Sequence, residues 1–174
     1  MKRLPELRGR PIRVTFQPAL TAHRGQLLSG SSKGLAVNAG SFLRDRQIIL
    51  EDQLRRTPGQ LARIFVHEVF HFVWWRLGNK ARMSYEALLM KEFRRGAKGE
   101  LGWSAEKLKR ELTVNSAPAR NALWRLYVCE SFCDTGGWAF GGKRRYAEMT
   151  LAPSFRQKRL TWMRETLGDG PLSI

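Results

Sequence analysis

Apolar and polar residues alternate near the N-terminus in the pattern of a β-strand. Ile12, Val14 and Phe16 are separated by single polar residues, which places the three apolar side chains on one face of an extended segment. The glycine- and serine-rich residues 24–34 that follow are typical of a loop. We therefore expect one half-buried strand followed by a loop.

Two further β-prone segments, residues 34–42 and 46–52, are separated by a short charged connection. This arrangement predicts a hairpin that leads directly into a helix. We expect the helix to begin with Thr57 as its N-cap and Pro58 at its first position, and to stop at Gly78. Apolar residues occupy almost every side of it, so it should lie at the centre of the fold.

The second half of the chain has the periodicity of α-helices. Residues 85–95 and 104–112 each have one apolar and one polar face. A longer helix is expected over residues 118–135, because this segment opens with a proline and closes at a pair of glycines. A last helix is expected over residues 154–167. Since no repeat or linker divides the chain, residues 1–174 predict a single domain.

The composition is that of a folded protein with a strongly basic surface. Apolar residues make up 43% and charged residues 26% of the chain, which argues against general disorder. The 31 Lys and Arg residues outnumber the 15 Asp and Glu residues, and the formal net charge is +16. The positive charge is spread along the chain, for example over residues 55–63 and 156–164. We read it either as a solvated surface or as a surface for nucleic acid or an acidic partner.

The sequence carries no signal for a membrane or for secretion. It has no run of about 18 uncharged apolar residues and no apolar segment behind its basic N-terminus. Its two cysteines, Cys129 and Cys133, are four residues apart in a predicted helix, which fits free thiols packed as small apolar groups. We therefore expect a cytoplasmic protein without membrane contact. Nothing in the sequence indicates an oligomeric state.

The apolar central helix contains a polar motif whose spacing suits a metal ion. His67 and His71 are four residues apart, so both imidazoles lie on one helix face and can bind the same ion. Glu68 lies about 100° from His67 around the helix axis, where its carboxylate can bind a water without being a ligand. These are the groups that a zinc hydrolase needs in order to activate water.

A second reading of this motif is a buried helix whose His and Glu side chains are satisfied by hydrogen bonds alone. Three ionisable side chains among Phe, Val and Trp would cost several kcal/mol without a compensating partner, and a metal ion supplies one. We therefore favour the zinc (Zn2+) site.

Two residues are candidates for the third ligand of a tetrahedral site. His23 is the remaining histidine, but it lies upstream beside the predicted loop. Glu130 is the stronger candidate, because it shares a helix face with Asp134 in an apolar segment; the alternative is a solvated acidic face. Glu130 could bind the ion, and Asp134 could accept a hydrogen bond from a ligating imidazole. Cys129 and Cys133 precede these acids and point about 100° away, so we do not expect them to share the ion.

An HExxH helix followed by a helix with an ExxxD motif resembles the gluzincin metallopeptidases, the thermolysin-like group. The matching segments are residues 67–71 and 130–134, and the likeness extends to the strand before the first helix. The family implies that Glu130 is the third zinc ligand and that Asp134 supports a ligating histidine. It also implies a zincin-like α+β fold, in which a small N-terminal sheet, antiparallel or mixed, packs on the central HExxH helix and a mainly helical C-terminal part follows.

The resemblance implies further site residues outside the two motifs. Asn38 and Ala39 are similar to the Asn-Ala dipeptide of the substrate-binding edge strand in thermolysin-like enzymes, although an ordinary hairpin explains them equally well. In the family a tyrosine or histidine beyond the ligands stabilises the oxyanion. Tyr146 is the candidate here, with Arg144 and Arg145 as alternatives, and a packing role for Tyr146 is equally compatible with the sequence.

The resulting hypothesis is a zinc metallopeptidase that hydrolyses a peptide or protein substrate with a metal-activated water and Glu68 as general base. One alternative is a DNA-associated protease similar to the SprT-like group, although this chain lacks the third histidine that completes the zinc site there. Another is a metal-binding regulatory or nucleic-acid-associated module that keeps a gluzincin-like fold and has little or no proteolytic activity.

Overall fold

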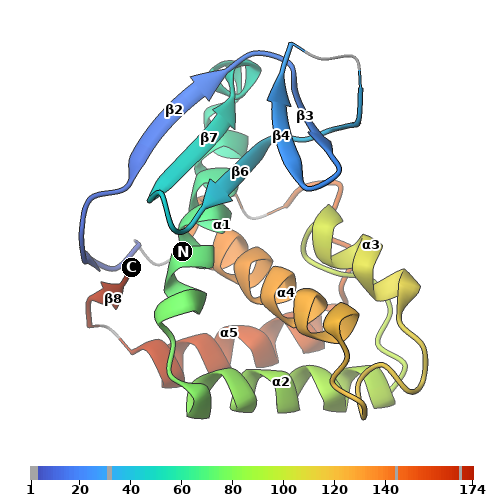
Figure 1. The fold of residues 1–174 in the computed structure, drawn as a ribbon. Helices are drawn as coiled ribbons and strands as arrows, with labels where there is room; N and C mark the ends of the chain where they lie inside the picture. The colour runs from blue at the N-terminus through green and yellow to red at the C-terminus, as the bar shows by residue number, and fades with distance from the viewer. Residues whose placement is uncertain (1–3, 31–32, 144, 169) are drawn as a thin grey trace.

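The computed structural model describes residues 4–30, 33–143, 145–168 and 170–174. Within them the chain forms a mixed α+β fold of five α-helices and three small sheets, which confirms the predicted fold class at this level. The two three-stranded sheets lie at one end of the molecule and helices α2 and α5 at the other, with α1 and α4 between them (Figure 1).

The sheet next to α1 consists of β2 (Arg13–Gln17), β7 (Gln47–Glu51) and β6 (Ala39–Phe42), in the order β2-β7-β6. β2 runs parallel to β7, and β6 pairs antiparallel with β7 through the predicted hairpin. The middle strand buries residues 48–50, a continuous apolar run typical of a strand covered on both faces. The first predicted strand and the hairpin are therefore confirmed.

A second sheet shows that the loop predicted after the first strand was wrong. β3 (Leu20–His23) pairs antiparallel with β4 (Gln26–Ser29) on one side and with β5 (Leu35–Ala36) on the other. Arg24 and Gly25 form the turn between β3 and β4 with φ angles of 48° and 78°. A two-residue hairpin of this kind needs two positive φ angles. Arginine is unusual at the first position, so the sequence carried no strong hairpin signal.

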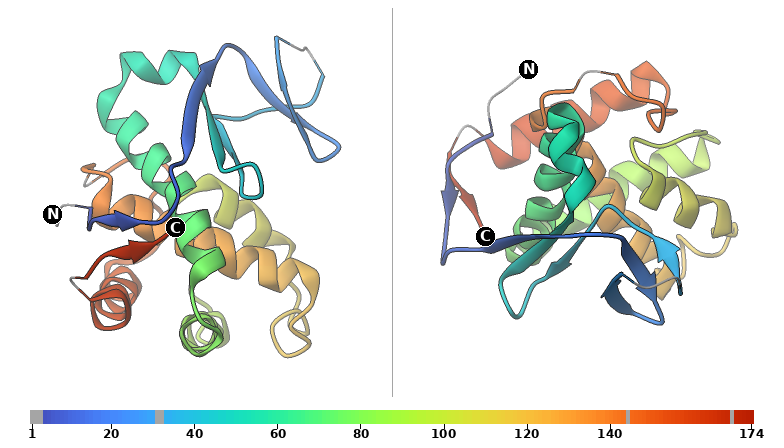
Figure 2. Two further views of the ribbon diagram at one scale, coloured as in Figure 1. Left: turned by 60° about the vertical axis from the view of Figure 1, so that its left-hand side comes forward. Right: turned by 90° about the horizontal axis from the view of Figure 1, so that it is seen from above.

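The third sheet joins the two ends of the described chain. β1 (Leu7–Arg8) lies parallel to β8 (Leu172–Ser173), and Figure 2 shows the two strands side by side near the termini. Sequence reasoning predicted neither strand, because two residues are too few for a periodic signal.

The predicted central helix is α1 (Pro58–Arg76), which packs along α4 (Ala122–Phe140). It follows a 3-10 helix, Asp52–Arg56, and starts at Pro58 as predicted, although the Thr57 side chain makes no capping hydrogen bond. α1 ends at Arg76 with Leu77 as its C-cap, so the chain leaves the helix just before Gly78 as predicted, and Gly78 is also the N-cap of α2.

The start of α4 differs from the predicted start at residue 118. Asn121 caps the helix by accepting a hydrogen bond from the Trp124 backbone N–H at 2.8 Å. Arg120 has a positive φ of 46°, which interrupts any helix that would begin earlier.

The end of α4 also differs, because the helix passes through the glycine pair that was expected to stop it. Gly136 and Gly137 are helical and α4 continues to Phe140. A Cβ on Gly136 would overlap the buried ring of Phe70 on α1. The glycines therefore allow α4 to pack closely against α1.

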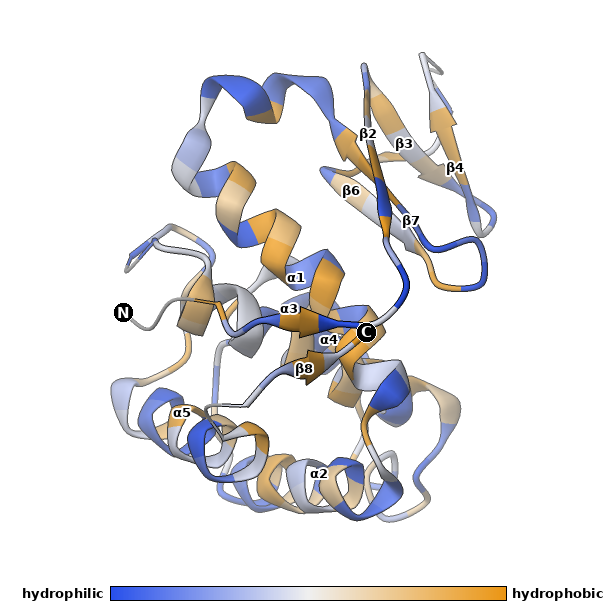
Figure 3. Ribbon diagram, turned by 90° about the vertical axis from the view of Figure 1, so that its left-hand side faces the viewer, coloured by the Kyte–Doolittle hydropathy of each residue, from blue (hydrophilic) through white to orange (hydrophobic). Residues whose placement is uncertain are grey.

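Three shorter helices surround this pair: α2 (Asn79–Arg94), α3 (Trp103–Glu111) and α5 (Pro153–Leu167). α3 and α5 lie within one residue of their predicted bounds, whereas α2 begins earlier than residue 85. Figure 3 shows α1 between the two three-stranded sheets on one side and helices α2 and α5 on the other, and all three helices carry both apolar and polar segments. In the described part of the chain, no helix has the length and apolar character needed to cross a bilayer.

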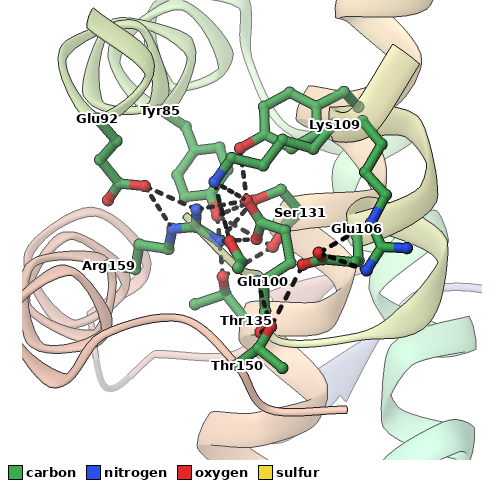
Figure 4. Close-up of polar contacts among 12 residues, drawn as sticks. Tyr85, Glu92, Glu100, Glu106, Lys109, Ser131, Thr135, Thr150 and Arg159 are labelled. Atoms are coloured by element: carbon green, nitrogen blue, oxygen red, sulfur yellow. Dashed lines mark hydrogen bonds and ion pairs between the residues drawn. The ribbon is translucent and has the colours of Figure 1, made fainter. Parts of the chain in front are cut away.

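A buried ion-pair network holds α5 to the other helices (Figure 4). Arg159 is fully buried and donates hydrogen bonds to Glu92 at 2.7 Å and to Glu100 at 2.6 Å. Glu100 also accepts from the Tyr127 hydroxyl at 2.6 Å and from the Lys109 ammonium at 3.0 Å. Burial would raise the pKa of Glu100, but the charge and hydrogen bonds of Arg159 outweigh it and lower the pKa to about 2.

We expect Arg159→Met to lower the free energy of unfolding by about 3–5 kcal/mol, because it leaves two buried carboxylates without their main partner. Urea unfolding at neutral pH measures the change. The matched control is Arg110→Met, which removes an exposed ion pair with Glu106 and should leave stability unchanged within error. Equal losses in the two variants would contradict a structural role for the network.

Candidate metal centre

The two motif histidines direct ring nitrogens at each other from one face of α1. The Nε2 atoms of His67 and His71 are 3.2 Å apart. The segment is helical throughout, so the four-residue spacing places the rings one turn apart, as predicted. Two imidazole nitrogens this close form either a hydrogen bond or two ligands of one shared ion.

Glu130 reaches the same point from α4. Its Oε2 lies 3.4 Å from His67 Nε2, and its Oε1 lies 3.8 Å from His71 Nε2. Burial would raise the pKa of Glu130, but the hydrogen bond from His67 and the charges of both histidines lower it to about 2. The packing of α1 on α4 thus brings the three predicted ligands together. The other candidate, His23, lies on β3 and joins no cluster of metal-ligating side chains in the described residues.

Asp134 contacts the outer nitrogen of His67. The His67 Nδ1–H donates to Asp134 Oδ1 at 2.8 Å, so in the neutral form of the ring Nε2 carries the lone pair that a metal needs. Asp134 is buried, and its Oδ2 has no hydrogen-bond partner among the described residues. This is the supporting position that the sequence predicted for Asp134.

Glu68 lies next to the histidines, and a residue of the β-sheet holds its carboxylate in place. Ligand atoms of Glu68, His67 and His71 all lie within 4.8 Å of one another. The Ser41 hydroxyl on β6 donates a hydrogen bond to Glu68 Oε2 at 2.6 Å and also lies 3.1 Å from the Glu68 backbone carbonyl oxygen. The sequence did not reveal Ser41, because only the fold places β6 beside α1. One carboxylate oxygen is therefore held in place, and the other can contact a water or substrate.

Two cavities meet at His67 and Glu68. One of about 200 Å³ is also lined by Asn38, Ala39 and Arg63, so the predicted substrate-binding residues Asn38 and Ala39 do lie at the site. The second is also lined by Ala39, and it reaches the other two predicted ligands, His71 and Glu130. A substrate in these cavities would lie between β6 and α1.

The predicted oxyanion residue Tyr146 is engaged elsewhere. Its hydroxyl donates to the Leu101 carbonyl at 2.7 Å, and it is not one of the described residues that line the two cavities. Arg145 lines a separate cavity beside Trp138, and Arg144 lies outside the described residues. The structure therefore does not bring Tyr146 or Arg145 to Glu68.

Arg63 is a cationic side chain that lines the cavity with Glu68, and sequence reasoning missed it. It is buried, ion-pairs with Glu148 at 2.6 Å, and has an Nε without a partner among the described residues. In the sequence, Arg63 belongs to the basic stretch of residues 55–63. Its position one helical turn before His67 was the signal that could have placed it in the site.

Cys129 contacts the other histidine. Its Sγ lies 3.7 Å from His71 Nδ1, the ring nitrogen opposite to the one near His67. Hydrogen bonds from Cys133 and His71 lower the pKa of the Cys129 thiol to about 6. The sequence predicted that Cys129 points away from Glu130, but it did not predict this contact. Each histidine therefore has a partner on its outer nitrogen.

Nearby acceptors raise the pKa values of both histidines and so favour their protonated forms. Burial would lower the pKa of His67, but the charge and hydrogen bond of Asp134, with those of Glu130, raise it well above its ordinary value. For His71 the effect of burial is outweighed by the Cys129 hydrogen bond and by the charge of Glu130, and the pKa rises to about 9. A metal ion must displace these protons in order to bind.

Comparison of the chain with protein-family profiles, curated proteins and solved structures finds no match. The assignment of the site rests on its own side chains and their geometry.

Zinc affinity should rise with pH, because protons compete with the metal for both imidazoles. Since both pKa values lie above 6.5, we expect a rise of about tenfold or more per pH unit between about pH 6.5 and 8.5. Titration against a chromophoric chelator at each pH measures it. Asp134→Asn removes the main charge that holds the proton on His67 and should make the rise shallower. A pH-independent affinity of the unaltered chain would rule out protonated histidines.

Gly102→Ala should disturb the site through Asp134. Gly102 has extended backbone at the start of α3, and an added Cβ would overlap Asp134 Oδ1, the oxygen that contacts His67. We expect zinc affinity to fall by about 10–100-fold, as for loss of a group that orients a ligand. The matched control is Gly78→Ala, also at an extended N-cap but with no atom within 4 Å of the added Cβ. If both variants bind zinc like the unaltered chain, Asp134 does not support the site.

Proposed function

We propose that the protein is a zinc-dependent metallopeptidase of the gluzincin type. The observation that carries this proposal is the convergence of His67, His71 and Glu130 beside Glu68, at the meeting point of two cavities. The sequence spacing within either motif does not bring the two motifs together. Their ligands come from α1 and α4, which are far apart in the sequence.

The donor set fits a zinc ion. Two imidazole nitrogens and one carboxylate are the ligands found in catalytic zinc sites that keep a fourth position open. Asp134 Oδ2 is buried and accepts no hydrogen bond from the described residues, and a cation nearby would offset part of the cost of burying this carboxylate. Zinc held by His67, His71 and Glu130 would supply Lewis acidity for the scissile carbonyl and would lower the pKa of a water.

The residues of the chain then have separate tasks in peptide hydrolysis. Glu68 accepts the proton of the attacking water and passes it to the leaving amine. Ser41 keeps one Glu68 oxygen in place at 2.6 Å, so the base is already oriented before the substrate arrives. Asp134 holds the His67 tautomer that presents Nε2.

An extended peptide is the substrate class that the site geometry favours. β6 lies at the edge of its sheet, so one side of this strand has no β-partner among the described strands. Ala39 and Ser41 on β6 both line cavities that reach Glu68. A peptide that pairs with this edge would pass beside the general base.

A regulatory or nucleic-acid-associated module without efficient proteolysis is the second candidate. The net charge of +16 favours a polyanionic or acidic partner. Tyr146 also donates to Leu101 rather than into a cavity, and Arg63, a cationic donor that lines the cavity, is paired with Glu148. This candidate predicts zinc binding without turnover. Free Cys129 and Cys133 fit the reducing cytoplasm for either function.

We expect about one zinc per chain in protein purified without added metal, with the zinc lost in His71→Ala and Glu130→Ala. Glu68→Gln should keep the zinc but lower peptidase activity by at least about 100-fold, because it removes the base and not a ligand. Elemental analysis measures the metal, and fluorogenic peptide libraries measure turnover.

The control for Glu68→Gln is Glu165→Gln, the same change at an exposed position of α5, which should retain activity and zinc. Absence of zinc in the unaltered chain after reconstitution would refute the metal site. Zinc binding with no turnover on any peptide would refute the peptidase and favour the second candidate.

A further inference from the structure

His71, Cys129 and Cys133 form a second cluster of ligand atoms beside the proposed zinc site. The two cysteines are four residues apart on α4, so they share the helix face that meets α1 at His71. One ligand atom from each of the three residues lies within 4.8 Å of the others. Cys133 is buried and Cys129 partly buried, which shields the cluster from bulk water.

We infer that these three residues bind a soft, thiophilic cation such as Cu(I), in competition with zinc for His71. Two soft thiolates make the set with one borderline imidazole a soft one, whereas two imidazoles and a hard carboxylate form a harder set that suits zinc. No further His, Cys, Asp or Glu joins this cluster among the described residues. A closed structural zinc site takes four protein ligands, so a three-ligand thiolate site favours a monovalent soft ion.

The two ring nitrogens of His71 serve different ligand sets. Nδ1 lies 3.7 Å from Cys129 Sγ, whereas Nε2 lies 3.2 Å from His67 Nε2 and 3.8 Å from Glu130 Oε1. A neutral imidazole has a lone pair on only one nitrogen and a proton on the other. If Nδ1 binds the soft cation, Nε2 carries the proton and His71 is lost to zinc. If Nε2 binds zinc, the Nδ1–H faces Cys129.

Binding of the soft cation is a ligand exchange without oxidation or reduction. Both thiols lose their protons to solvent, and each thiolate and His71 Nδ1 donate an electron pair to the ion. The contact between Cys129 and His71 is thereby replaced by bonds to a common ion. His71 therefore binds either zinc, which supports hydrolysis, or the soft cation, which removes a zinc ligand and inhibits hydrolysis. The competition rests on the proposed zinc site, but the thiolate site itself does not.

Silver(I) is the probe for this site, because it is a monovalent soft cation that is not readily oxidised. The reduced 174-residue chain is titrated with Ag(I) in chloride-free buffer, with stoichiometry read by native mass spectrometry and affinity by competition. We expect one Ag(I) per chain, with binding weakened by at least about tenfold in Cys129→Ser, Cys133→Ala and His71→Ala. Glu130→Gln is the matched control, since it should weaken zinc binding and leave Ag(I) binding intact. Circular dichroism verifies that each variant is folded.

The second measurement is zinc affinity with and without bound Ag(I). We expect Ag(I) to weaken zinc binding by at least about tenfold in the unaltered chain and to have no effect in Cys129→Ser. Failure of Ag(I) to bind, or equal binding by the unaltered chain and the cysteine variants, would overturn the thiolate site. Unchanged zinc affinity with Ag(I) bound would overturn the sharing of His71. If zinc fails to bind even without Ag(I), the proposed function and the competition fall, while Ag(I) binding still supports the thiolate site.

Discussion

The close packing of α1 against α4 is the interaction on which the candidate site depends. Gly136 and Gly137 lie in this interface, where a Cβ on Gly136 would overlap the Phe70 ring and one on Gly137 would lie 3.0 Å from a backbone carbonyl of α1. Without side chains at these positions the two helices can approach closely. Only this approach brings His67 Nδ1 within 2.8 Å of Asp134, so a wider spacing would separate the histidines from their carboxylate partners.

The same core buries two polar clusters, and they are neutralised in different ways. In the Arg159 network the chain supplies its own cation, which ion-pairs with Glu92 and Glu100. The candidate metal centre brings the carboxylates Glu68, Glu130 and Asp134 around two histidines. Arg63 lines the same cavity but is paired with Glu148, so protons on the rings or a metal ion are the remaining sources of positive charge close to these carboxylates, which agrees with the raised pKa values of both histidines.

The N-terminal sheet contributes chemistry as well as packing. Ser41 on β6 holds the carboxylate of Glu68, and Asn38 and Ala39 line the cavity on the same side. Arg63 closes this cavity from α1 and is paired with Glu148. The candidate site is thus formed by three parts of the chain: the sheet holds the proposed base, α1 carries that base and two of the proposed ligands, and α4 supplies the third proposed ligand and the carboxylate that contacts His67.

The sequence by itself determined the features that depend on short-range periodicity. The strand alternation, the apolar central helix and the four-residue spacings of His67 with His71 and of Glu130 with Asp134 follow from residues a few positions apart, so they were predictable. The starts of α2 and α4 and the hairpin of β3 and β4 were misjudged, because capping and turn geometry depend on single backbone conformations such as that of Arg120.

Only the tertiary structure decided which side chains meet. Ser41 donates a hydrogen bond to Glu68, and Cys129 contacts His71. Arg63 lines the cavity in which the sequence predicted Tyr146, whose hydroxyl instead donates to Leu101. These contacts join segments that are far apart in the sequence, and they depend on how deeply one helix packs into another. Helical and strand periods place a side chain on a face of its own element, but they do not specify which part of another element that face will contact.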